Sequence, residues 1–215
     1  MKTIKFILLL SLFSTLRAEA EFSPLLPTQT IIKNNWKNLR DLSVVKQNFE
    51  SSCGGASLAT LLTFYYGQTV SETDILKALE NNGKKAVSFS EMQKILPQFG
   101  FQGQGYAAGY EQLKQLKIPV VVYIKLRGED HFSVLRGIND DTVLLADSSY
   151  GNVTLSKEQF LDVWQTRQNE NSDLKGKFLA VLPTKTDIKA SDNFFTKQPK
   201  KQTDLAIRAI GILRN

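Results

Sequence analysis

Cysteine and histidine are almost absent from this chain of 215 residues, which contains one of each, Cys53 and His131. A lone cysteine cannot form an intrachain disulfide, and one cysteine with one histidine lacks the converging ligands of a metal site. The sequence therefore predicts no metal and no other cofactor. Any chemistry that requires both a thiol and an imidazole must use Cys53 and His131.

Long apolar runs are also missing, except near the N-terminus. Residues 1–20 combine a basic start, a short apolar stretch over 6–16 and the tripeptide Ala18-Glu19-Ala20. This order is typical of a secretory signal that is cleaved after Ala20, whereas a membrane span needs roughly 20 apolar residues. We expect a periplasmic protein with no transmembrane span after signal cleavage.

Export bears on the interpretation of the cysteine, because exported proteins commonly pair their cysteines as disulfides. An unpaired thiol indicates either pairing with another molecule or a functional thiol, and a small buried core residue is the third interpretation. Composition alone leaves these alternatives open.

The charge pattern does not indicate a nucleic-acid partner. The formal net charge is +6, but the basic residues are scattered until the C-terminal tail and are not interleaved with aromatic residues. We attribute the charge to solubility or to weak attraction by an anionic surface or partner.

The chain divides into four stretches by composition. These are the expected signal peptide over 1–20, an extended lead-in over 21–40, a folded domain over 41–183 and a basic C-terminal tail over 184–215. The tail ends in an apolar segment at 205–213. We interpret the tail as a flexible segment whose terminal helix or strand packs back on the domain, with docking to a partner as the alternative.

Helical periodicity and capping signals dominate the first half of the domain. They predict helices over residues 53–66, 71–80, 88–99 and 110–116. β-branched runs in the second half predict strands over 118–124, 131–138, 142–147 and 177–182, with a helix over 156–164 before the last strand. Helices followed by a meandering antiparallel sheet define an α+β fold.

The predicted elements suggest a catalytic arrangement. Cys53 begins a helix, whose N-terminus supplies backbone N–H groups and the positive end of the dipole to a thiolate, and Gly54 and Gly55 are expected to leave room for a substrate. His131 begins a strand and is the available base. A histidine base needs an acceptor on its other nitrogen, and antiparallel pairing would bring Asp147, at the end of the next strand, close to His131.

Acyl transfer also needs a donor for the developing oxyanion. Gln47 lies six residues before Cys53 and can supply a side-chain amide, with the backbone N–H of Cys53 as the second donor. Spacing alone does not separate this role from that of a solvent-exposed glutamine. Asp147 likewise has an alternative interpretation as a plain turn residue.

Four motifs in order resemble the bacteriocin-processing (double-glycine) cysteine peptidases. They lie at residues 47–67, 131–137, 138–151 and 153–160, and the resemblance covers roughly 42–183. It implies a papain-like peptidase fold over the domain at 41–183, with N-terminal helices packed on an antiparallel sheet.

The resemblance also implies a role for each candidate site residue. Cys53 would be the nucleophile, His131 the general base and acid, Asp147 the residue that orients the imidazole, and Gln47 the oxyanion donor. It further implies cleavage after small residues.

Two positions and the architecture depart from the family pattern. Ser52 stands where the family often has aspartate, and Ser148 stands where it often has proline. Both substitutions put the substrate preference in doubt. Many relatives are fused to transporter membrane spans and an ATPase, which this chain lacks. With its signal peptide, the chain resembles the stand-alone exported members of bacterial functional-amyloid (fap-type) secretion systems.

We therefore expect a periplasmic cysteine endopeptidase that cleaves an exported polypeptide by thiolate attack and acyl-enzyme hydrolysis. The expected partners are a secreted polypeptide substrate and components of a secretion or biofilm pathway. Two alternatives share the same residues. One is a non-enzymatic papain-like accessory that binds or escorts a secreted subunit, and the other is a cell-wall amidase or acyl transferase.

Overall fold

The computed structural model describes residues 36–80, 86–168 and 172–201, which belong to one compact unit. The expected signal peptide at 1–20 and the apolar segment at 205–213 lie outside the described residues. Among the helices that are described, none combines the length and the apolar character needed to cross a bilayer.

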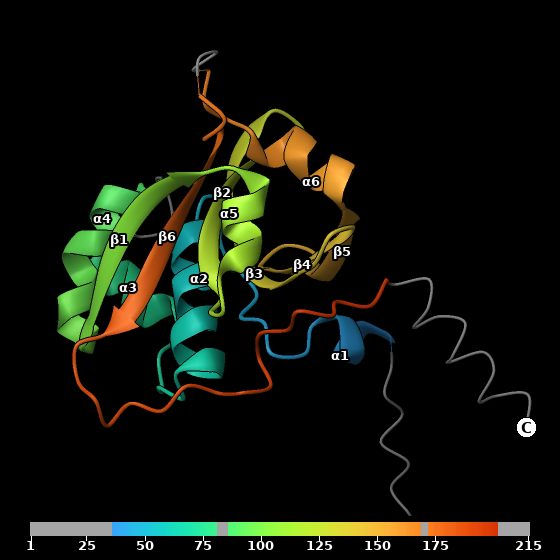
Figure 1. The fold of residues 1–215 in the computed structure, drawn as a ribbon. Helices are drawn as coiled ribbons and strands as arrows, with labels where there is room; N and C mark the ends of the chain where they lie inside the picture. The colour runs from blue at the N-terminus through green and yellow to red at the C-terminus, as the bar shows by residue number, and fades with distance from the viewer. Residues whose placement is uncertain (1–35, 81–85, 169–171, 202–215) are drawn as a thin grey trace, which may run out of the picture. The chain divides into compact units, whose positions relative to one another are not determined.

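The described strands form a single antiparallel sheet in the order β1-β6-β2-β3-β4-β5 (Figure 1). The predicted strands in the second half are confirmed as β2, β3, β4 and β6. The bounds are β1 (Phe101–Ala108), β2 (Val120–Leu126), β3 (Glu129–Ile138), β4 (Thr142–Asp147), β5 (Gly151–Ser156) and β6 (Gly176–Pro183).

All of the predicted helices are confirmed. Three of them begin with a capping box at Ser71, Ser88 or Ser156. The serine hydroxyl accepts the backbone N–H of the residue three positions later, and the side chain of that residue accepts the backbone N–H of the serine. The bounds are α1 (Trp36–Arg40), α2 (Cys53–Thr60), α3 (Glu72–Ala78), α4 (Phe89–Ile95), α5 (Tyr110–Gln115) and α6 (Lys157–Trp164). A π-helical turn over Leu61–Tyr65 prolongs α2, and a 3₁₀ turn over Leu96–Phe99 prolongs α4.

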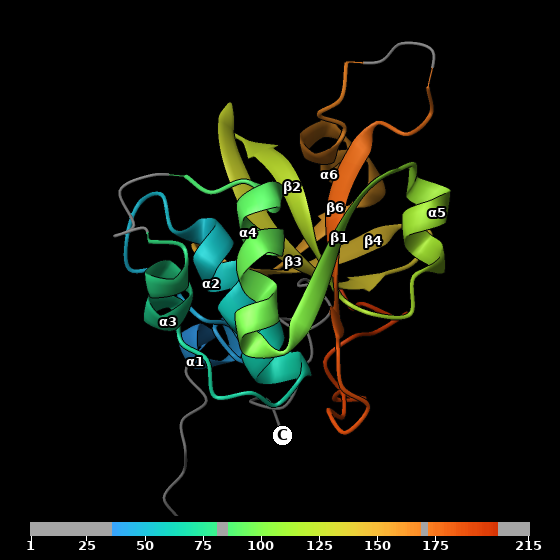
Figure 2. The same cartoon turned by 90° about the vertical axis from the view of Figure 1, so that its left-hand side faces the viewer.

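Helices cover both faces of the sheet, so two hydrophobic clusters flank it (Figure 2). Helices α2 and α4 pack on one face, with Leu58, Leu62 and Met92 in the core. Helices α5 and α6 pack on the other face, with Phe160 and Trp164 in the core. All residues of α2 are buried, so this helix is held on every side and provides a rigid platform for its first residue.

Two strands, β1 and β5, were not predicted. The sequence of β1 is rich in glycine and glutamine, which have little preference for strands. This segment is nevertheless a strand because it pairs with β6 along its whole length, from Phe101 opposite Pro183 to Ala108 opposite Gly176. Tertiary pairing therefore overrides the local preference of the chain.

The predicted extended lead-in over 21–40 is wrong at its end, which forms helix α1. The prolines that favoured an extended chain, Pro24 and Pro27, lie before this helix and therefore do not interrupt it. Residues 21–35 lie outside the described residues.

The predicted end of the domain at Pro183 is too early. Phe194 is buried in the core, and the guanidinium of Arg136 lies 4.5 Å from the centre of its ring. Thr196 forms a parallel bridge with Gly137 at a bulge in β3, and its N–H donates to the carbonyl of Arg136. The first part of the expected tail is thus built into the domain.

Candidate active site

Cys53 is the first residue of α2 and is 6% exposed. The first backbone N–H groups of a helix have no partner within the helix, and they carry the positive end of its dipole. The preceding residue, Ser52, occupies the N-cap position but does not cap the helix with its side chain. A thiolate at Cys53 therefore faces favourable electrostatics from α2.

A hydrogen bond one helical turn further along places Cys53 beside the sheet. Ser57 shares the face of α2 that carries Cys53, and its hydroxyl donates to the carbonyl of Phe132 at 3.1 Å. Phe132 follows His131 directly in β3. The side chain of Cys53 interacts with that of His131 and raises its pKa, and the bond from Ser57 links the two elements that carry them.

His131 is held by a hydrogen bond to Asp147. The Nε2 atom of His131 lies 2.8 Å from Oδ2 of Asp147, and both side chains are buried. In the register of β3 and β4, Val134 faces Ala146, which brings the end of β4 next to the start of β3. The predicted proximity of His131 and Asp147 through strand pairing is confirmed. Because Asp147 engages Nε2, Nδ1 is the ring nitrogen that remains available to Cys53.

The surroundings of His131 favour its charged form. Burial by itself lowers the pKa of His131, because it disfavours the imidazolium. The hydrogen bonds to Asp147 and Cys53, with the negative charges of these two groups, outweigh burial and raise the pKa of His131 from 6.5 to about 9. His131 is therefore an imidazolium at neutral pH.

Asp147 is kept ionised by His131 and, to a smaller extent, by the tight turn that follows it. Burial acts to raise the pKa of Asp147, but the hydrogen bond and charge of His131 prevail and lower it. The second carboxylate oxygen, Oδ1, accepts the backbone N–H groups of Ser149 and Tyr150 at 2.9 and 3.0 Å. These bonds fix the carboxylate so that its other oxygen points at His131.

Gln47 lies in the loop before α2, and both ends of its amide are engaged. Its Nε2 donates to the carbonyls of Phe49 and Glu50 at 2.9 and 3.1 Å. Its Oε1 accepts the hydroxyls of Ser148 and Ser149 at 2.7 and 2.8 Å. Carbonyl oxygens can only accept, which sets the orientation of the amide. The turn that follows Asp147 therefore also holds Gln47.

A buried carboxylate that the sequence analysis did not select supports the same loop. Glu72 is 2% exposed and accepts the backbone N–H and the side-chain amide of Asn48 and the hydroxyl of Ser52. The sequence indicated Glu72 only as part of a helix start. Its partners lie 20 and 24 residues away, and no local pattern reveals such a contact.

The expectation that Gly54 and Gly55 leave room for a substrate is wrong. A side-chain carbon at Gly54 would lie 2.4 Å from Val87 and 2.5 Å from Met92, and one at Gly55 would lie 3.2 Å from Leu76. These glycines face neighbouring elements of the core. They allow α2 to pack closely against the rest of the domain.

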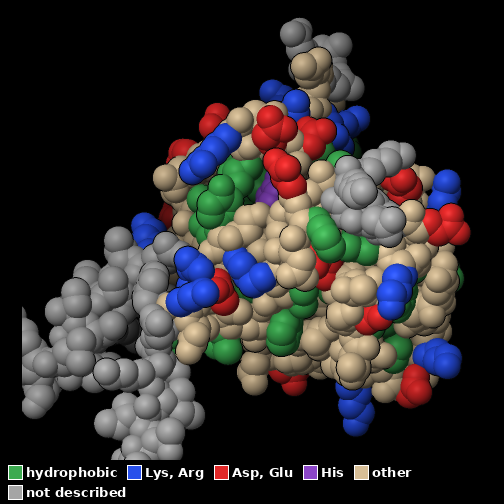
Figure 3. Space-filling model, turned by 180° about the vertical axis from the view of Figure 1, so that it is seen from behind, with side chains coloured by type: hydrophobic (Ala, Val, Ile, Leu, Met, Phe, Trp, Pro, Cys, Tyr) green, Lys and Arg blue, Asp and Glu red, His purple; other side chains and the backbone are tan. Residues whose placement is uncertain are grey.

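Metal ligands do not gather at this site or elsewhere in the described part of the chain. Residues 36–80, 86–168 and 172–201 contain no group of three or more histidine, cysteine, aspartate or glutamate side chains arranged to hold a metal ion. The reactive groups are instead a thiol and an imidazole. Figure 3 shows the single histidine at the base of a depression, with hydrophobic side chains beside it.

A thiol at a helix N-terminus, facing an imidazole held by a carboxylate from an antiparallel sheet, defines a cysteine peptidase of papain-like fold. Two solved structures show the same fold. The peptidase domain of Streptococcus ComA, a bi-functional ABC transporter involved in a quorum sensing pathway, has a TM-score of 0.55 and 21% sequence identity. The match covers 65% of this chain and 97% of that domain.

The second solved structure is a double glycine motif protease from an AMS/PCAT transporter in complex with the leader peptide. Its TM-score is 0.54 and its sequence identity is 23%, over 66% of this chain and 91% of that one.

Residues 41–168 match the Peptidase C39 family, and the chain belongs to this family. A curated relative from Pseudomonas fluorescens, named "Probable functional amyloid protease FapD", is 32% identical over 148 residues. The match covers 65% of this chain and 66% of the relative. The predicted resemblance to double-glycine cysteine peptidases is confirmed, and the chain is a cysteine peptidase.

Proposed function

We propose that this protein is a periplasmic endopeptidase that cleaves an exported polypeptide after small residues. The observation that carries the proposal is the geometry of three buried side chains. Cys53 begins α2, the Nε2 atom of His131 lies 2.8 Å from Asp147, and Nδ1 remains available to the thiol. This arrangement supports Cys53 as nucleophile, His131 as acid and base, and Asp147 as the residue that orients the imidazole.

In the proposed reaction Cys53 attacks as a thiolate and the imidazolium of His131 supplies the proton for the leaving group. The Cys53 thiolate adds to the scissile carbonyl and forms a tetrahedral oxyanion. The imidazolium of His131 gives its Nδ1 proton to the leaving amine, the C–N bond breaks, and an acyl-enzyme remains on Cys53. A water molecule then loses a proton to His131 and adds to the acyl carbonyl. Collapse of this second intermediate releases the acid and restores the thiolate and the imidazolium.

The oxyanion would be stabilised by the backbone N–H of Cys53 and the side-chain amide of Gln47. In the structure, both N–H groups of Gln47 bind carbonyls of the loop before α2. The role requires that the oxyanion replaces one of these, and the bond to Glu50 is the longer of the two at 3.1 Å. Ser148 and Ser149 would hold the carbonyl end of the amide during the exchange.

The relatives support the proposed class of substrate. The Pseudomonas fluorescens relative is named as a functional amyloid protease, and one structural neighbour was solved with a leader peptide. We propose that residues 1–20 direct export and that the substrate is a secreted polypeptide of a functional-amyloid or biofilm pathway. Components of the corresponding secretion system are the proposed further partners.

The experiment incubates the protein from residue 21 onward with exported polypeptides encoded by neighbouring genes, and mass spectrometry locates the cut. We expect one cut after small residues, and no cut by the Cys53→Ala variant. If the polypeptide is still cut in the presence of Cys53→Ala, this protein is not the peptidase, and the non-enzymatic accessory remains as the alternative. A parallel incubation with peptidoglycan tests the amidase alternative, and release of peptidoglycan fragments without cleavage of any polypeptide would overturn the proposal.

A further inference from the structure

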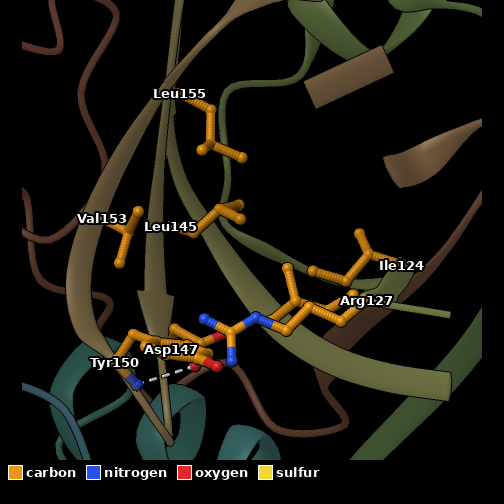
Figure 4. Close-up of a pocket in the computed structure, with 8 residues that line it drawn as sticks. Ile124, Arg127, Leu145, Asp147, Tyr150, Val153 and Leu155 are labelled. Carbon is orange, nitrogen blue, oxygen red and sulfur yellow. Dashed lines mark hydrogen bonds between the residues drawn. The ribbon is translucent and has the colours of Figure 1, made fainter. Parts of the chain in front are cut away.

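An apolar pocket opens beside the paired His131 and Asp147. Its floor and walls come from Ile124 and Leu126 of β2, Leu145 of β4, and Val153 and Leu155 of β5. Arg127, Asp147 and Tyr150 form one end (Figure 4). Ile124 and Leu145 are buried, whereas Val153 and Leu155 are only partly buried. The pocket is therefore a hollow that solvent reaches, and not a closed packing defect of the core.

The polar end of the pocket lies next to the reactive groups. Asp147 contributes to the pocket and, through Oδ2, binds His131. Tyr150 is 43% exposed, and its N–H binds the other oxygen of Asp147, as the dashed line in Figure 4 shows. Arg127 has a positive φ of 54° in the turn between β2 and β3, and its side chain extends toward Asp147 (Figure 4).

The chemistry decides which part of a substrate passes this pocket. His131 must give its proton to the leaving amine, so the segment that follows the scissile bond departs on the side of His131. Asp147 binds Nε2 of the same imidazole and also lines the pocket. The pocket beyond Asp147 therefore borders the leaving segment, and not the part of the substrate that becomes attached to Cys53.

The size and lining of the pocket indicate which kind of group it can bind. Its volume is about 240 Å³, which is below the roughly 300–1,000 Å³ typical of sites for drug-sized ligands and cofactors. It can accept one or two side chains. The walls offer aliphatic carbon, and polar groups occur only at one end, so an apolar side chain gains more from entering than a polar one.

We infer that this pocket is a specificity site that binds an apolar side chain of the substrate segment released in the first step. The inference rests on the proposed function, because it assigns the pocket to the leaving side of that reaction. It predicts that cleavage depends on an aliphatic or aromatic residue shortly after the cut.

The test uses acceptor amines, which occupy the leaving side when they react with the acyl-enzyme. A peptide thioester that ends in Gly-Gly acylates Cys53 and releases its thiol. Leucinamide, glycinamide or aspartamide then competes with water. The amine adds to the acyl carbonyl, His131 takes its proton, and Cys53 leaves as the thiolate. We expect leucinamide to be used at least about tenfold better than glycinamide, as measured by mass spectrometry of the two products.

A pocket-filling variant and a matched control sharpen the result. Val153→Phe should abolish the preference for leucinamide and leave hydrolysis of the thioester within about twofold. Leu182→Phe places the same ring at an exposed position on β6, outside the pocket, and should keep the preference. Equal use of leucinamide and glycinamide, or a preference for aspartamide, would overturn the inference.

A binding measurement separates failure of the pocket from failure of the proposed function. Cys53→Ala protein with labelled leucine and valine methyl groups is titrated with N-acetylleucinamide. We expect saturable shifts of the Leu145, Val153 and Leu155 signals. Failure of the thioester to acylate Cys53 would contradict the proposed function, while the absence of these methyl shifts would contradict the pocket whatever the thioester does.

Discussion

Replacing Asp147 with asparagine should change the charge state of His131 and leave the shape of the site intact. Asparagine can still accept a hydrogen bond from Nε2 of His131, but it lacks the negative charge. In the wild-type protein the pKa of His131 is raised from 6.5 to about 9, and a difference of this size corresponds to about 3 kcal/mol in favour of the imidazolium. Without the carboxylate, its hydrogen bond and charge no longer favour the imidazolium, and we expect the pKa of His131 to fall back to its ordinary value near 6.5.

This fall gives a pH-dependent loss of activity. With a pKa of about 9, most His131 is charged at pH 8, whereas with a pKa near 6.5 only about 3% is charged. A step that needs the imidazolium should therefore slow about thirtyfold at pH 8 and less than about twofold at pH 6 in Asp147→Asn. In the wild-type protein, activity should fall as the pH rises through about 9.

The same shift stabilises the fold below a defined pH. Because the folded pKa of His131 lies above the unfolded value, its contribution is fully present below pH 6.5 and is lost as the pH rises through about 9. Urea unfolding of the wild-type protein should therefore show lower stability at pH 10 than at pH 7. Asp147→Asn should lose most of this part of the pH dependence.

The scarcity of reactive residues makes the assay unambiguous. The single histidine gives a single pair of imidazole C–H signals for NMR titration, and the single cysteine gives one site of alkylation by iodoacetamide. Asp141→Asn, at an exposed turn position, serves as the control and should leave both titrations unchanged. A wild-type His131 that titrates near 6.5, or an Asp147→Asn variant in which the pKa of His131 does not move, would show that Asp147 does not set the charge of the imidazole.

Three further predictions concern stability and the loop before the nucleophile. Glu72→Ala leaves buried donors without their acceptor and should lower the free energy of unfolding by about 2–3 kcal/mol. It should also slow the alkylation of Cys53. An unchanged alkylation rate would show that Glu72 does not position the loop. Phe194→Ala opens a cavity in the core and should cost about 3–5 kcal/mol in urea unfolding, whereas a cost near zero would mean that the C-terminal segment is not docked in solution. Gly176→Ala would place a carbon 2.1 Å from the indole of Trp164 and should lower the melting temperature, at a cost of about 1–3 kcal/mol; a variant as stable as wild type would contradict this close packing.

Helix starts could be predicted from the sequence because their determinants are local. Ser71, Ser88 and Ser156 each exchange hydrogen bonds with a residue three positions later. Strand β1 could not be predicted in the same way, because its glycines and glutamines do not favour a strand and its partner β6 lies some seventy residues further along the chain. The docking of Phe194 escaped prediction for the same reason.

The candidate site likewise contains residues that could be predicted from the sequence and contacts that could not. Cys53 and His131 could be identified from the sequence because each is the single residue of its kind. Asp147 could be identified because hairpin pairing is a short-range relation. The contact between Glu72 and Ser52 and the bonds from Ser148 to Gln47 join residues 20 and 101 positions apart. Such contacts leave no periodic or spacing signal.

The reactive groups, the starts of the serine-capped helices and the antiparallel direction of the predicted strands could all be deduced from the sequence alone. Those properties follow from residue chemistry and from interactions over a few positions. Only the tertiary structure decided that the Gln47 amide is engaged at both ends, that Gly54 packs in the core, and that an apolar pocket lies beside Asp147. These features depend on side chains from distant segments, whose meeting is set by the packing of the whole domain.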